Sequence, residues 1–222
     1  DHSTTGGLHD IGADFIKHVT GIQVVKGSQG TLYGANAVGG VINFITTDSY
    51  ANSISTTVGS NNTKGITLKI HKDIDNHSIS IIADGTKSDG ISVAPSGSEK
   101  DGFDANNITI NTNSKYDGYD IRTTLMRRSS ESDLDASGSD DLDYTSENDM
   151  NLYQLSSKMN DKWDITPGVE YEYFDGAFIN RGSYSSNVDT DGENVGYFVN
   201  GNLIASDKLL VSAGVRQDDP SL

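Results

Sequence analysis

The chain has 222 residues, of which 34% are hydrophobic, and a formal net charge of −16 at pH 7. Such acidity argues against nucleic acid as a partner, because phosphates repel an acidic protein, and the absence of cysteine excludes disulfides and thiolate metal sites. No apolar run approaches the ~18 residues of a transmembrane helix, but a polar composition fits a transmembrane β-barrel, in which every second strand residue faces lipid.

The first predicted element is a glycine-rich β unit over residues 22–47. Short apolar runs at 22–25 and 41–45 flank glycines, which serve tight turns and close backbone approach. A phosphate loop is excluded because no Lys follows Gly39 and Gly40, and the glycine spacing does not match a dinucleotide fingerprint. The residues alone predict a strand, a compact connection and a second strand, with the glycines serving turns.

This stretch resembles the end of the plug domain in TonB-dependent outer-membrane receptors. There the plug ends with a pattern such as I-E-V-V-[RK]-G-P-x-[ST]-x-L-Y-G-x-x-A-x-G-G-V-I-N-I-I-T, from which the departures of the chain include Gln23, Ser28 and Phe44. The resemblance implies that residues 1–48 are the C-terminal part of a plug and that residues 49–222 are N-terminal strands and extracellular loops of a β-barrel. The plug-motif residues that it singles out are Gly27, Leu32, Tyr33, Gly34, Ala37, Gly39, Gly40 and Asn43.

After the plug motif, polar and apolar residues alternate with the period of a β-strand. Short turns on one side and long polar segments at 87–104, 129–149 and 176–194 on the other are typical of an outer-membrane barrel, although a soluble sandwich also alternates. Barrels of single bacterial chains have even strand numbers, so we expect an all-β transmembrane antiparallel barrel of which this chain holds a fragment. The nine expected strands lie near 54–58, 66–70, 79–83, 108–112, 119–125, 153–159, 163–173, 195–205 and 209–215.

The parity of the alternation divides the strands into two faces. We expect one set of side chains to face lipid and the other to face the lumen of the barrel, because neighbouring residues of a strand point to opposite sides. The expected lipid-facing residues are Val58, Leu68, Ile81, Leu125, Ile165, Tyr171 and Val211. The expected lumenal residues are Lys69, Asp84, Arg122, Glu170 and Arg216.

Carboxylates crowd the first two long polar segments. They repel one another unless they are solvated or bridged by a hard cation such as calcium, which takes roughly 6–8 oxygen ligands. No EF-hand spacing is present, and a solvated acidic surface is the alternative. Residues 99–103 are similar to an acidic loop of the vitamin B12 branch of the resembled receptors, which implies calcium-ordered loops. The candidate calcium ligands are Glu99, Asp101, Asp104, Asp133, Asp135, Asp140, Asp141 and Asp143.

Two classes of function follow. The resemblance implies an active importer in the outer membrane of a Gram-negative bacterium, taking up a scarce nutrient of the cobalamin or iron-siderophore class. Its partners would be membrane lipid, the ligand and a TonB-type energy-coupling protein that binds a segment upstream of this sequence. A passive porin or an adhesin is the alternative, but neither needs a plug motif. An enzyme is not expected, because the five histidines lack metal-binding spacing and no nucleophile elbow is present.

Overall fold

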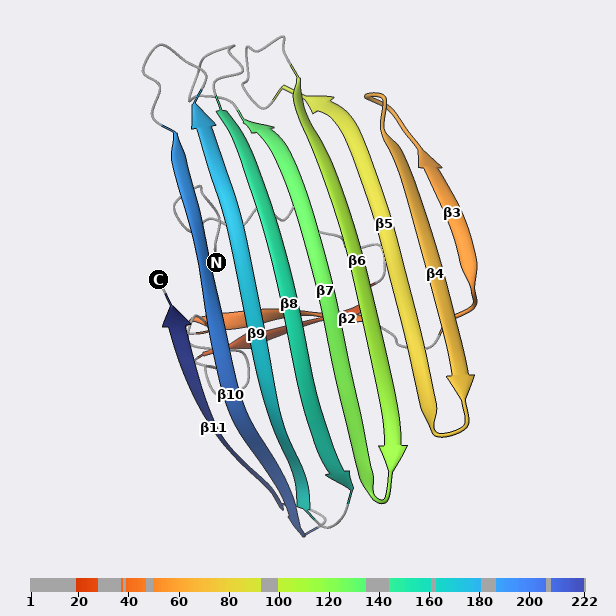
Figure 1. Ribbon diagram of the computed structural model, residues 1–222, viewed down its shortest axis with the longest axis vertical. Coiled ribbons are helices and arrows are strands. Elements are labelled where there is room, and N and C mark those ends of the chain that lie inside the picture. Colours follow the sequence, from red (N-terminus) through yellow and green to blue (C-terminus); the bar gives the residue numbers. More distant parts are fainter. Residues whose placement is uncertain are drawn as a thin grey trace.

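The computed structural model describes residues 19–27, 37, 39–46, 50–92, 100–134, 144–160, 163–180, 187–206 and 209–221. In this part of the chain all regular structure is β, and it forms one hairpin and one large sheet (Figure 1). The hairpin consists of β1 (Val19–Lys26) and β2 (Gly40–Thr46). The large sheet consists of β3 (Ser53–Val58), β4 (Lys64–Ile74), β5 (His77–Ile91), β6 (Asp101–Tyr116), β7 (Tyr119–Leu134), β8 (Tyr144–Asn160), β9 (Trp163–Asn180), β10 (Val188–Ser206) and β11 (Leu209–Ser221).

The large sheet is an antiparallel meander. Within the described residues its nine strands follow one another in chain order from β3 to β11, and β3 is not paired with β11. Figure 1 shows long strands lying side by side with a common tilt, and the hairpin crossing behind them at a steep angle. This arrangement confirms the all-β antiparallel architecture and the nine strands expected from the alternation.

The long polar segments are the part of the expected fold that was wrong. β5 continues to Ile91 and β6 begins at Asp101, so half of residues 87–104 lies in strands. Likewise only residues 135–143 separate β7 from β8, and only 181–187 separate β9 from β10. The backbone ladder does not depend on side-chain polarity, so the strands extend beyond the point at which apolar residues stop alternating.

The opposite end of the sheet is closed by tight hairpins. Asp75 and Asp117 have φ values of 51° and 44°, and Gly118 has a φ of 81°. Two consecutive residues with positive φ, as at Asp117 and Gly118, match the twist of the paired strands, and Asp-Gly is a favoured sequence for that turn. The connections at this end are therefore short, as the sequence predicts.

The register confirms the division of side chains into two faces. Residues directly opposite each other in antiparallel strands share a face, and the pairs Ile81–Ile110, Ile110–Leu125, Leu125–Tyr153 and Tyr153–Tyr171 run across five strands. We call this side the apolar face; it also holds Leu68, Ile165, Val199 and Val211. The opposite side, the polar face, holds Lys69, Asp84, Arg122, Glu170 and Arg216.

Burial differs between the two faces. Leu68, Leu125 and Val211 on the apolar face all remain exposed, whereas Asp84 and Ser80 on the polar face are buried. Large exposed aliphatic surfaces on soluble monomers are unusual and mark an interaction or membrane surface. Among the described residues there is no helix with the length and hydrophobicity to cross a membrane.

Candidate functional site

The hairpin of β1 and β2 is closed at its neck by glycines of the plug motif. Gly27 N donates a hydrogen bond to Gly39 O at 3.2 Å, and Gly27 has a φ of 92°. Gly40 has a φ of 150°, and a Cβ there would lie 2.6 Å from the backbone oxygen of Val25. Glycine is required at Gly40 because no side chain fits that approach.

The other plug-motif residues divide into two groups. Asn43 lies in β2 opposite Gln23, and Ala37 is buried. The structure therefore brings Gly27, Gly39 and Gly40 together at the neck and places Asn43 along the hairpin. The motif positions Leu32, Tyr33 and Gly34 lie outside the described residues.

The segment that leads from the hairpin into the large sheet is attached to the polar face. The Tyr50 ring centroid lies 5.9 Å from that of His71, and the Nζ of Lys69 lies 5.9 Å from the Tyr50 centroid. The backbone N of His71 donates to Oδ1 of Asn52 at 2.6 Å. Lys69 and His71 both point from β4 to the polar face, so the chain enters the sheet on that side.

A Ser-His-Asp contact lies at the same place. His71 Nδ1 is 2.9 Å from the hydroxyl of Ser80, and His71 Nε2 is 3.2 Å from a carboxylate oxygen of Asp73. A nucleophilic serine must reach its substrate, but Ser80 is only 1% exposed. The contact therefore fixes the position of the His71 ring and does not form an accessible catalytic site.

A cluster of enclosed charges on the polar face lies on β9 to β11. Arg216 NH2 donates to Oε1 of Glu170 at 2.8 Å, and its Nε donates to Oδ1 of Asp218 at 2.8 Å. The side chain of Arg216 is 4% exposed, while those of Glu170 and Asp218 are 19% and 16% exposed. Charge-assisted bonds of this kind are strong and directional, so one guanidinium joins β9 to β11 across β10.

The charge cluster packs against one aromatic ring and over glycine residues. The Arg216 guanidinium lies 5.8 Å from the Phe198 ring centroid, within range of a cation–π contact. It also lies over Gly196, where an added Cβ would collide with it, and the Phe198 ring covers Gly168 in the same way. Glycine at these two positions allows the side chains to lie flat against the sheet.

A second buried carboxylate lies on β5. Asp84 is 5% exposed, and its Oδ1 accepts a hydrogen bond from Nδ2 of Asn107 on β6 at 3.4 Å. Thr67, the neighbour of Asp84 on β4, is also buried. The polar face thus carries two separate enclosed acidic positions, one on β5 and one on β9 to β11.

The acidic residues near the other end of the strands do not assemble a metal site in the described part of the chain. Asp101 and Asp104 lie three residues apart on β6, so they point to opposite faces, and Asp104 lies 3.5 Å from Lys87 Nζ. Asp133 is on β7, and no group of three acidic, His or Cys side chains within the described residues is able to hold an ion. The candidates Glu99, Asp135, Asp140, Asp141 and Asp143 lie outside the described residues, so the calcium site stays a prediction.

Comparison with known proteins supports the fold. No family model and no curated protein matches the chain. The siderophore receptor PiuA from Acinetobacter baumannii is 17% identical with a TM-score of 0.65, covering 90% of this chain and 35% of that one. The ferric-catecholate import receptor Fiu from E. coli K12 is 16% identical with a TM-score of 0.61, covering 89% and 38%. The copper transporter OprC is 15% identical with a TM-score of 0.52, covering 92% and 43%.

At these identities the likeness concerns the fold, and the chain spans less than half the length of each of these structures. About nine-tenths of the chain is covered in each of the three comparisons. The architecture that the resemblance implies is therefore confirmed, and the chain has the fold of one portion of these three structures.

Proposed function

We propose that the protein acts as a TonB-dependent receptor of the Gram-negative outer membrane that imports a small nutrient. The observation that carries the proposal is the combination of two features. The first is a hairpin in which Gly27, Gly39 and Gly40 hold β1 and β2 together, and the second is a sheet that is apolar on one face and polar on the other. A barrel wall in lipid needs such a division of its side chains, and a plug is useful only if passage through the barrel is controlled.

The proposed division of labour follows the domains expected from the sequence. Residues 1–48 form the end of the plug, and residues 49–222 form barrel wall and extracellular loops. A TonB-type protein of the inner membrane supplies the energy by pulling on the plug, as the resemblance of residues 22–47 to a plug end implies. The contacts of Tyr50 with Lys69 and His71 support this division, since they hold the entrance to the sheet while the hairpin is pulled.

The proposed ligand is a metal-bearing small molecule of the iron-siderophore class. Two of the structural neighbours are named for siderophore or ferric-catecholate uptake and a third for copper. Cobalamin is also a metal complex, but its assignment as the ligand rests only on the similarity of residues 99–103 to an acidic loop of the vitamin B12 receptors. In that case calcium would order the acidic loops before the ligand binds, and the oxygen donors would come mainly from the segment 135–143.

The experiment that tests the receptor function is energised uptake. The full-length protein is expressed in a receptor-deficient strain, and accumulation of a radiolabelled ferric siderophore is followed with and without an uncoupler that collapses the proton-motive force. We expect accumulation only in energised cells. Uptake that continues undiminished after uncoupling would refute the importer and favour the passive porin. A small sugar that enters through general porins serves as the control for cell integrity.

A further inference from the structure

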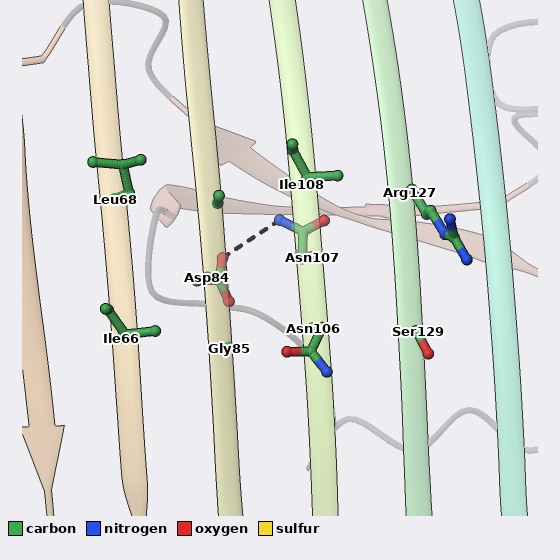
Figure 2. Close-up of a pocket in the computed structure, with 10 residues that line it drawn as sticks. Ile66, Leu68, Asp84, Gly85, Asn106, Asn107, Ile108, Arg127 and Ser129 are labelled. Atoms are coloured by element: carbon green, nitrogen blue, oxygen red, sulfur yellow. Dashed lines mark hydrogen bonds between the residues drawn. The ribbon is translucent and has the colours of Figure 1, made fainter.

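The apolar face carries a groove that the receptor function does not explain. It is an open cavity of about 380 Å³ that extends across β4, β5, β6 and β7 (Figure 2). Ala83 and Gly85 on β5 form its floor between Ile66 and Leu68 on β4 and Ile108 on β6. The carboxamide of Asn106 lies over Gly85. The groove exists because two small residues of β5 lie between larger ones: Ala83 lies between Leu68 and Ile108, and Gly85 lies between Ile66 and Asn106.

One side of the groove is polar and positively charged. Arg127 and Ser129 line it from β7, opposite Ile108 and Asn106 of β6. In Figure 2 the Arg127 side chain extends from β7 toward the side away from β6. Arg127 is exposed, and its register neighbours on β6 and β8, Ile108 and Asn151, are uncharged. Because a guanidinium binds the oxygens of a phosphate through a fork of donors, this side is suited to an anionic phosphate group.

One carboxylate of this face, that of Asp104, already has partners. The carboxylate of Asp104, on the same face of β6, lies 3.5 Å from Lys87 Nζ and also accepts a hydrogen bond from Nδ2 of Asn106 at 3.2 Å. Arg127 makes no ion pair with any other side chain that the structure describes. A cation is therefore available beside an apolar groove in a protein with a net charge of −16.

We propose that this groove binds one molecule of a phosphate-bearing membrane lipid. An acyl chain lies over Ala83 between Leu68 of β4 and Ile108 of β6, beside the Asn106 amide that covers Gly85, and Arg127 and Ser129 donate to the lipid phosphate. The occupant is a lipid because the apolar floor and the cationic side are adjacent, which matches a molecule with an acyl chain joined to a phosphate. The inference rests on the proposed membrane location, since it needs the apolar face to meet lipid.

The test measures lipid retention by native mass spectrometry of the full-length protein in detergent. The probes are phosphatidylglycerol, diacylglycerol and inorganic phosphate. Ala83→Leu fills the floor of the groove, and Ala213→Leu places the same side chain elsewhere on the apolar face, on β11. Arg127→Gln removes the charge, and Arg122→Gln does so on the polar face of the same strand.

We expect one phosphatidylglycerol per protein, retained about tenfold more strongly than diacylglycerol, as one charge-assisted contact of ~1.4 kcal/mol gives. Ala83→Leu should abolish retention and Arg127→Gln should lower it about tenfold, while both control variants keep it. The site would be refuted if Ala83→Leu bound lipid as well as Ala213→Leu. Equal binding of diacylglycerol, or displacement of the lipid by inorganic phosphate alone, would also overturn it.

These outcomes are separate from those of the receptor function. Lipid retention is measured in detergent and needs neither an energy source nor a transported ligand. If energised uptake fails while one phosphatidylglycerol is retained, the receptor function is wrong and the lipid site stands. If uptake succeeds and Ala83→Leu retains lipid like its control, the lipid site is wrong and the receptor function stands.

Discussion

Neutralising Arg216 should destabilise the sheet more than neutralising any exposed charge on it. Arg216→Met removes the guanidinium that binds Glu170 and Asp218 at 2.8 Å each. Both carboxylates are then left mostly buried without their cation, since their side chains are only 19% and 16% exposed. Breaking a buried ion pair by removing one partner costs about 3–5 kcal/mol. We expect about 3 kcal/mol, the lower end of that range, because both carboxylates keep some contact with water.

The measurement is the free energy of unfolding, from guanidinium titration of the protein folded in detergent and followed by far-ultraviolet circular dichroism. Arg122→Met is the matched control, because Arg122 is an exposed arginine on the same face; it should change the free energy by less than about 0.5 kcal/mol. A triple variant, Arg216→Met with Glu170→Gln and Asp218→Asn, removes all three charges together. It should regain most of the lost stability, because no uncompensated charge remains buried.

The reasoning would be refuted by either of two results. A loss of less than about 1 kcal/mol in Arg216→Met would mean that the two carboxylates are hydrated and that the cluster behaves as a surface ion pair. A triple variant as unstable as the single one would mean that Arg216 acts through packing on Phe198 and Gly196 rather than through its charge.

Three further predictions concern the faces, the hairpin and the loops. In lipid vesicles, a water-soluble maleimide should label the variant Arg122→Cys, because residue 122 faces a water-filled lumen. It should not label Leu125→Cys, three residues along β7, because residue 125 faces lipid. The reverse pattern would show that the two faces are exchanged. Gly40→Ala should destabilise the hairpin by more than about 1 kcal/mol and speed amide exchange in β1 and β2. Gly39→Ala should not, because a Cβ at Gly39 meets nothing within 4 Å, and equal exchange in both variants would contradict the proposed neck. If calcium orders the acidic loops, a chelator should weaken ligand binding in calorimetry, and an unchanged affinity would leave those residues as a solvated surface.

The sequence by itself determined which residues share a face. Side chains alternate strictly along a strand, and antiparallel pairing keeps opposite residues on the same side. The alternation within each strand, such as Leu125 against Arg122 on β7, therefore separates its two faces, and the apolar sets of neighbouring strands fix how those faces pair. The glycine neck of the hairpin was predictable for a similar reason, because the local backbone at Gly27 and Gly40 requires those residues.

Only the tertiary structure decided where the strands end and which charges meet. Hydrogen bonds between strands form regardless of side-chain polarity, so the polar extensions to Ile91 and Leu134 have no signal in the alternation. The contact of Arg216 with Glu170 joins residues 46 positions apart. It depends on the registers of β9 with β10 and of β10 with β11 together, and a shift of either strand would separate the charges. Cross-strand pairing is a property of the assembled sheet, which is why neither the cluster nor the groove over Gly85 could be predicted from the chain alone.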